Sequence, residues 1–104
     1  MAHIQISSPL LRSFVHADGT VDTVATALGS TEILGYPTTG TKRIIVIIQN
    51  KSTTASIEVI FNATGDDGIL VAAGQLLSVD NYNGIIRVNA SADATPIHLA
   101  YSEV

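Results

Sequence analysis

The segment from Arg43 to Gln49 is a run of β-branched residues, and it restricts the fold more than any other part of the chain. β-Branched side chains favour an extended strand over a helix. A strand with one face in the core and the other in water carries polar residues at every second position. Both alternating sets are apolar here: Ile44, Val46, Ile48 and, on the other side, Ile45, Ile47. The segment therefore predicts a strand that is covered on both faces.

The second apolar face needs a cover, because leaving two or three such side chains in water would forfeit roughly 1.5 to 3 kcal/mol each. Alternation also predicts outward positions for Ile60, beside Glu58, and for Ala100, beside His98. Two covers remain open: the N-terminal segment of the same chain, through Phe14, or a second copy of the chain. The residues predicted to form an oligomer or capsid interface are Ile4, Ile6, Leu10, Leu11, Ile45, Ile47, Ile60.

Short apolar or alternating runs separated by turn residues fill the rest of the chain. The expected strands besides residues 43–49 are 3–7, 20–28, 56–61, 69–71, 76–79, 85–89 and 97–101. Residues 20–28 also permit a short helix, and Asp80–Gly84 is predicted to be a hairpin connection because Asn-Gly supplies positive φ angles. The pattern predicts an all-β, jelly-roll-like β-sandwich of about seven to nine short antiparallel strands. Residues 1–104 form one domain on this interpretation, with 1–15 as an N-terminal arm or edge strand.

Charge and composition exclude several classes of protein. The chain of 104 residues has no cysteine, so disulfides, thiolate metal sites and cysteine nucleophiles are absent. A net charge of −4, with five scattered Lys and Arg residues, argues against nucleic acid as a direct partner. The longest apolar run is far shorter than the ~20 residues that span a bilayer as a helix, so we expect no membrane partner. The first residues lack a signal peptide's features, which predicts folding in a cytoplasm.

Candidate catalytic and ligand-binding groups are sparse. The three histidines, His3, His16 and His98, lie on separate segments without metal-ligand spacing. His98 could pair with Glu58 across neighbouring strands, and Asp66–Asp67 is best interpreted as a solvated loop tip rather than part of a calcium site. Nucleophile elbows, P-loops and dinucleotide fingerprints are absent. We expect no catalytic residue, cofactor or metal ion.

Carbohydrate binding is an alternative, because jelly rolls can hold sugars between aromatic and amide side chains of their loops. The chain has no Trp and three Tyr. Tyr82, with its neighbours Asn81 and Asn83, is the candidate glycan contact.

From Arg43 to Glu103 the layout resembles that of small β-sandwich structural proteins of tailed bacteriophages, of the capsid cement or decoration type. The features that carry the resemblance are a basic residue opening a strand that ends in Asn50, then 57–59, 68–70, 74–75, 84–86 and a terminal alternating strand ending in Glu103. Residues 1–40 lie outside it. The resemblance implies a homotrimer in the virion, made in the host bacterial cytoplasm, that binds the major capsid protein and is not an enzyme. Its alternative is a carbohydrate- or receptor-binding module of a phage tail or fibre.

Overall fold

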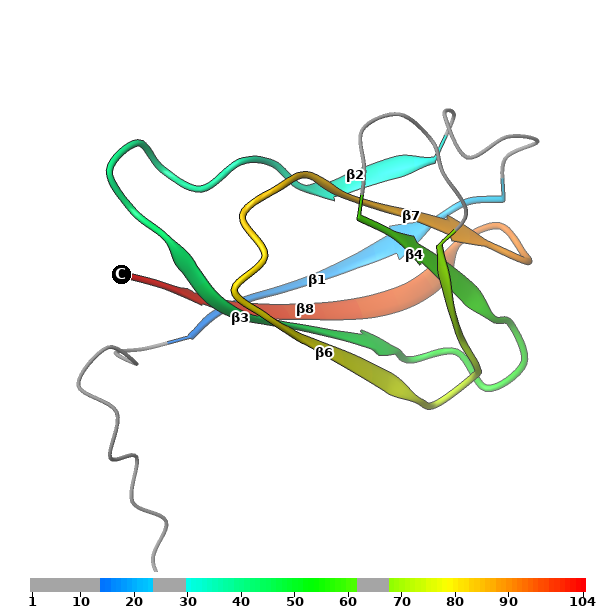
Figure 1. Cartoon of the computed structure of the whole chain (residues 1–104). Helices are drawn as coiled ribbons and strands as arrows, with labels where there is room; N and C mark the ends of the chain where they lie inside the picture. Colours follow the sequence, from blue (N-terminus) through cyan, green and yellow to red (C-terminus); the bar gives the residue numbers. More distant parts are fainter. Residues whose placement is uncertain (1–13, 24–29, 62–67) are drawn as a thin grey trace, which may run out of the picture.

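The computed structural model describes residues 14–23, 30–61 and 68–104. These residues form eight strands: β1 (Val15–Val21), β2 (Thr31–Leu34), β3 (Arg43–Asn50), β4 (Ile57–Ile60), β5 (Ile69–Val71), β6 (Leu76–Asp80), β7 (Ile86–Ala90) and β8 (Thr95–Glu103) (Figure 1). No part of the described chain is a helix long and apolar enough to cross a membrane.

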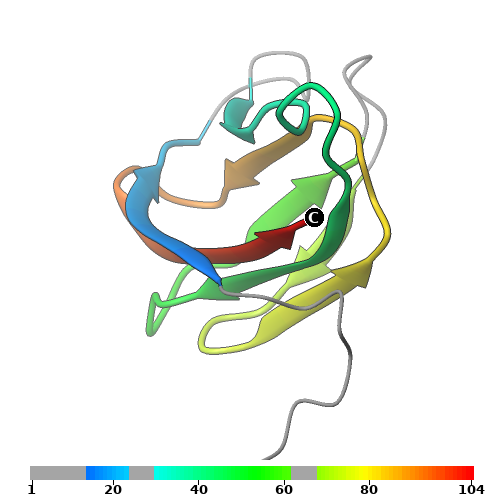
Figure 2. The same ribbon diagram turned by 90° about the vertical axis from the view of Figure 1, so that its left-hand side faces the viewer.

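Two four-stranded antiparallel sheets make up the fold, and they stack as two layers (Figure 2). Sheet A has the order β1-β8-β3-β6, and sheet B has the order β2-β7-β4-β5. The first four strands pair with the last four in mirror order, β1 with β8, β2 with β7, β3 with β6 and β4 with β5. A long hairpin that wraps around itself gives this pairing, which is the jelly-roll topology. The predicted all-β, jelly-roll-like sandwich is confirmed.

The core lies between the layers and is built from the inward side of each strand. Its fully buried members are mostly Val and Ile, which suit a pleated, enclosed surface. They include Val46, Ile48, Ile57, Val59, Ile86 and Val88. Burying each such side chain contributes about 1.5 to 3 kcal/mol, and the sum offsets the conformational entropy lost on folding.

Strand β3 has the arrangement that its sequence predicts. Val46 and Ile48 are fully buried in the core, whereas Ile45 and Ile47 point to the other side of sheet A and are half-buried. The pairing with β8 shifts by one residue between Arg43 and Ile45. This shift turns Arg43 inward, so the first residue of the strand is buried although it is charged.

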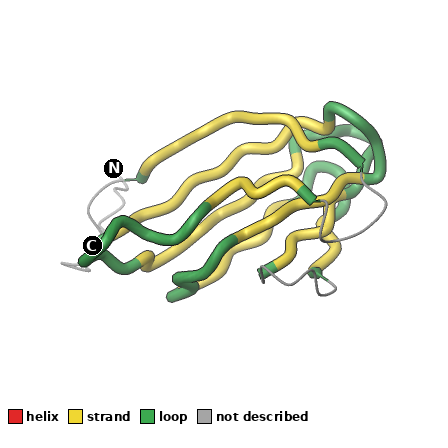
Figure 3. The backbone as a smooth tube through the Cα atoms, turned by 90° about the horizontal axis from the view of Figure 1, so that it is seen from above, coloured by secondary structure: helices red, strands yellow, loops and turns green. Residues whose placement is uncertain are grey.

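The first part of the chain differs from the sequence-based prediction. β1 begins at Val15 and ends at Val21, so the strand predicted over 20–28 starts too late, and residues 22 and 23 follow it as irregular chain. β1 forms because all seven of its residues pair with β8, not because of local strand propensity. It starts at the end of the sandwich where β8 finishes (Figure 3). The strand predicted over 3–7 lies outside the described residues, as do residues 24–29.

The hairpin predicted at Asp80–Gly84 is wrong. β6 belongs to sheet A and β7 to sheet B, so the segment between them crosses from one layer to the other. The local signal was correct in part, because Asn81 has a positive φ of 58°. Gly74, with a φ of 77° that suits glycine, also lies in a turn that crosses between layers, from β5 to β6. Turn chemistry thus predicts a change of direction but not the sheet that receives the next strand.

Candidate contact surface and histidine cluster

The outer face of sheet A, the side turned away from sheet B, is the first candidate for a functional surface. Register places its side chains in rows that cross β8, β3 and β6, and two of the rows begin on β1. The rows are Ser102, Ile45, Asp80; His16, Ala100, Ile47, Ser78; and Asp18, His98, Gln49, Leu76. Small, uncharged or apolar residues therefore occupy the centre of this face, and the two aspartates lie on its edge strands.

Burial on the outer face of sheet A is uneven. Ala100 and Ser102 are almost fully buried, Ile45 and Ile47 are half-buried, and Leu76 is 59% exposed. The centre of the face is thus partly covered within the chain, and its apolar side chains still present surface to solvent. A partner that lies on this face would complete the burial of β3.

The remaining residues of the predicted interface have different positions. Ile60 has no exposed surface and lies in sheet B, so the expectation that it faces a partner is wrong. Its Cα partner in the sheet is Arg87, whose long side chain shares that face with it. The other predicted members, Ile4, Ile6, Leu10 and Leu11, lie outside the described residues, as does most of the N-terminal segment proposed as a cover.

A second apolar surface lies at the edge strand β5, and the sequence reasoning missed it. Leu70 is 71% exposed and Ile69 is about half exposed. Leu70 pairs with Glu58, which places it on the outer face of sheet B. The signal was the three-residue apolar run 69–71, which the sequence analysis interprets only as a strand.

The loop between β6 and β7 uses its polar groups internally. The Tyr82 hydroxyl donates to the carbonyl of Ile85 at 2.8 Å and also contacts the Phe61 carbonyl oxygen, and its ring meets the Phe61 ring edge to face at 5.2 Å. Burial raises the pKa of Tyr82 above its ordinary value. Asn83 accepts a hydrogen bond from the backbone N–H of Arg43 at 2.7 Å. The predicted glycan contact at Tyr82 is therefore a packing position.

Arg43 fixes this loop to the start of β3. Its guanidinium donates to the carbonyl of Gly84 at 2.9 Å and to the carbonyl of Gly35. Burial lowers the pKa of Arg43, but arginine stays protonated in proteins. A buried cation needs such partners, because leaving it without hydrogen bonds would be costly. The residue acts as a structural link between β3 and two loops.

A cluster of Asp18, His98 and His16 lies on the outer face of sheet A, over β1 and β8. The His98 Nδ1 atom lies 2.6 Å from Asp18 Oδ1, and His98 Nε2 lies 3.0 Å from His16 Nδ1. The two imidazole rings stack with centroids 5.2 Å apart and planes 30° apart. The hydrogen bond from His98 is the main reason that the pKa of Asp18 is lowered, and Lys51, 3.9 Å from the carboxylate, acts in the same direction.

Strand register brings these three side chains together. His16 lies opposite Ala100 and Asp18 lies opposite His98, so the two histidines are diagonal neighbours across β1 and β8. His98 and Glu58, which the sequence left able to pair across neighbouring strands, are not strand neighbours, because β8 and β4 belong to different sheets. The sequence contains only a weak signal for the cluster. His16 and Asp18 are two residues apart, so they would lie on one face of a strand, but no strand was predicted there.

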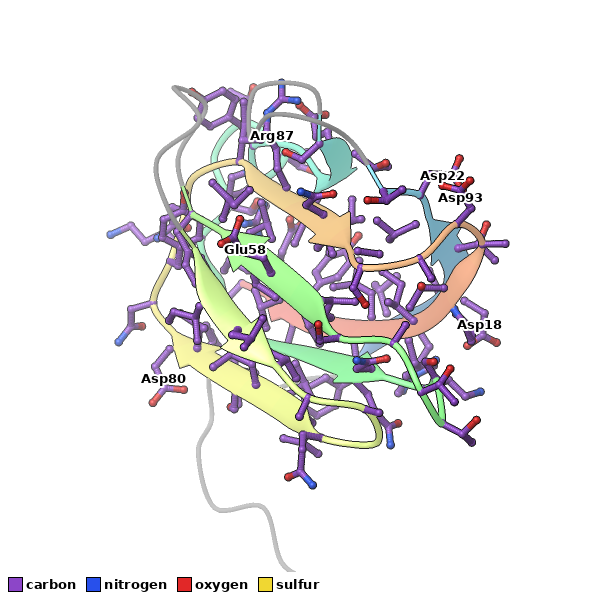
Figure 4. The ribbon with its side chains drawn as sticks, turned by 90° about the vertical axis from the view of Figure 1, so that its right-hand side faces the viewer. Asp18, Asp22, Glu58, Asp80, Arg87 and Asp93 are labelled. Atoms are coloured by element: carbon purple, nitrogen blue, oxygen red, sulfur yellow. The ribbon has the colours of Figure 1, made fainter. Side chains whose placement is uncertain are left out.

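Other features of the described residues are weaker candidates for a functional site. A cleft of about 160 Å³ lies beside β1, lined by Ala17, Asp18, Gly19, Thr20, Ile33, Ile97 and Leu99, and it is small beside typical ligand pockets of roughly 300 to 1,000 Å³. Asp22 and Asp93 lie near each other in Figure 4 because each caps the opposite loop, through Ala94 N–H and Thr23 N–H respectively. The described residues contain no group of three or more His, Cys, Asp or Glu that could hold a metal ion.

The strand order defines the chain as a jelly-roll β-sandwich, a fold that serves many unrelated functions. No protein-family model matches the sequence, and no curated protein matches it either. The function must therefore be argued from the surfaces of this chain.

Proposed function

We propose that this protein is a virion structural protein, a homotrimeric capsid cement or decoration subunit that stabilises the shell by binding neighbouring capsid subunits. The observation that carries the proposal is the central strand β3, where Ile45 and Ile47 are only half-buried on the outer face of sheet A. Contiguous apolar surface on one face of a protein is typical of sites that bind another protein. A second subunit on this face would bury them.

The composition of the outer face of sheet A suits protein association. Gln49, Ser78 and Ser102 surround the two isoleucines, and the charged residues of the rows, Asp18 and Asp80, lie on the edge strands. Interfaces have a core depleted of charge and a polar rim in the same way. Binding there would stabilise the assembled state by mass action, since a ligand that binds only that state shifts the equilibrium toward it.

A carbohydrate- or receptor-binding module of a tail or fibre is the second candidate, and one observation favours it. Tyr36, in the loop between β2 and β3, is 72% exposed, so its ring is available as a stacking platform. Glycan-array binding that is lost in Tyr36→Ala and kept in Ile47→Asp would support this module over the cement protein.

Sedimentation velocity over micromolar concentrations tests the cement proposal. We expect the wild-type chain to sediment as a trimer and the Ile47→Asp variant as a folded monomer, because the new carboxylate would be buried in the contact. Leu70→Asp is the matched control: it adds the same charge at an exposed apolar position on the other sheet and should leave the trimer intact.

Three results would contradict the proposal. A wild-type monomer at all concentrations removes the trimer, and a trimer that persists in Ile47→Asp moves the contact elsewhere. Unfolding of both Ile47→Asp and the milder Ile47→Thr, followed by circular dichroism, would show that the chain itself covers this face.

A further inference from the structure

We propose that His16 and His98 together bind a divalent transition-metal ion, with Cu²⁺ preferred, and that Asp18 orients His98 for this role. The site is on the outer face of sheet A but does not depend on the proposed virion function, because all three residues belong to one chain. Its first support is that two imidazole nitrogens from different strands, His16 Nδ1 and His98 Nε2, lie 3.0 Å apart.

The nitrogen separation suits a shared metal ion. With metal–nitrogen bonds of about 2.0 Å, neighbouring ligands of tetragonal Cu²⁺ lie about 2.8 to 2.9 Å apart, and those of tetrahedral Zn²⁺ about 3.3 Å apart. The observed 3.0 Å is closer to the tetragonal value. Rotation of one ring would aim the lone pairs of both nitrogens at one point. A metal ion there would replace the proton that lies between the two nitrogens. His16 would then carry its proton on Nε2.

Asp18 supplies the second support. Its carboxylate accepts the Nδ1 proton of His98 at 2.6 Å, which fixes the tautomer in which His98 Nε2 is free to donate its lone pair. Metal-binding histidines commonly have such a carboxylate behind them, which orients the ring and raises its basicity. Asp18 is thus a positioning residue and does not contact the metal itself.

The surroundings leave room for an ion. His16 and Asp18 are exposed, and the His98 side chain is 28% exposed, so water can complete the coordination. The charges that face the cluster are the Asp18 carboxylate and the Lys51 ammonium, which contacts Asp18 and not the rings. Phe14 lies 6.1 Å from the His16 ring, measured between centroids, and shields one side of it.

Calorimetric titration of Cu²⁺ into the untagged 104-residue chain tests the site. Every protein titrated, the reference chain included, carries His3→Ala, so that the third histidine contributes nothing to the measured binding. We expect one Cu²⁺ per chain, an electron paramagnetic resonance spectrum with two nitrogen ligands, and weaker binding of Zn²⁺. His16→Ala and His98→Ala should each lower the affinity at least tenfold.

Asp18→Asn separates a positioning role from general attraction of cations. It should weaken Cu²⁺ binding about 10- to 100-fold, as loss of an outer-shell partner does. Asp80→Asn is the matched control, because it removes the same charge from the opposite edge strand of sheet A (Figure 4) and should change nothing. Circular dichroism without metal checks that each variant is folded.

Several outcomes would overturn the proposal. Cu²⁺ binding that survives either histidine substitution shows that the ion lies elsewhere, and no binding at micromolar concentration shows that the rings only hydrogen-bond to each other. Equal losses in Asp18→Asn and Asp80→Asn would reduce the role of Asp18 to its charge. Tighter binding of Zn²⁺ than of Cu²⁺ would refute the choice of ion.

Discussion

Asn50 ends β3 with a fully buried side chain that joins three segments of the chain. Its Nδ2 group donates to the carbonyls of Ala55 at 2.8 Å and Val71 at 3.1 Å, and its Oδ1 atom accepts the N–H of Ser52 at 3.0 Å. Strand β3 belongs to sheet A and β5, which ends at Val71, belongs to sheet B, so this amide connects the two layers. We therefore predict that Asn50→Ala destabilises the fold strongly.

The magnitude follows from the groups that the substitution leaves behind. Three hydrogen bonds are lost, each with a net value of about 1 kcal/mol, and two carbonyls in a buried setting lose a donor at a further cost. The expected loss is about 3 to 5 kcal/mol, a large part of the roughly 5 to 15 kcal/mol that stabilises a domain of this size. Asn50→Asp should be worse at pH 7, because a carboxylate would face two carbonyl oxygens, and should recover as acid protonates it.

Urea unfolding followed by circular dichroism measures this loss. Gln49→Ala is the control, because it truncates the neighbouring amide, which points out of the core, and should change stability by only about 0.5 kcal/mol. A loss below about 1 kcal/mol in Asn50→Ala, or an Asn50→Asp variant that is as stable at pH 7 as in acid, would refute the reasoning.

Three further predictions concern the loop network and the histidine cluster. Tyr82→Phe should lower the free energy of unfolding by about 1 to 2 kcal/mol. Because burial raises the pKa of Tyr82 in the fold, wild-type stability should fall as pH rises above 10.0. Alkaline urea titrations should show a smaller loss of stability in Tyr82→Phe. Arg43→Lys should cost about 2 to 4 kcal/mol in urea unfolding, since an ammonium cannot span two carbonyls. The hydrogen bond from His98 lowers the pKa of Asp18 from 3.8, so wild-type stability should drop as pH falls below that value. Thermal unfolding measured across acid pH should show a larger drop in the wild type than in Asp18→Asn.

The strands of the second half could be predicted because their signals are local. The run 43–49 and the alternation of Ile57, Val59 and Phe61 need only strand periodicity to be interpreted, and the structure confirms both. β1 was not predicted because its His-Ala-Asp-Gly-Thr sequence has little strand propensity, and it forms only through its pairing with β8. The formation of β1 therefore depends on tertiary pairing and not on its local sequence.

The surfaces were harder to predict than the strands, because they depend on register and layer. His16 and His98 are 82 residues apart in sequence, and only the pairing of β1 with β8 makes them neighbours. Tyr82 is the candidate glycan contact in the sequence, yet its hydroxyl and ring are used inside the sandwich because the loop crosses between sheets. Neither the proximity of the two histidines nor the burial of Tyr82 can be predicted from the residues next to them in sequence.

The most direct test of the central claim, that another subunit covers the outer face of sheet A, is thiol protection. The chain has no cysteine, so Ser78→Cys places a single thiol beside Ile47, and Glu32→Cys places one on the edge of sheet B. Both parent side chains are exposed in the single chain. At protein concentrations that permit association, the Ser78→Cys thiol should react several-fold more slowly with a thiol reagent than in dilute solution, and the Glu32→Cys thiol should react equally fast in both. Equal rates for the Ser78→Cys thiol at both concentrations would contradict the account.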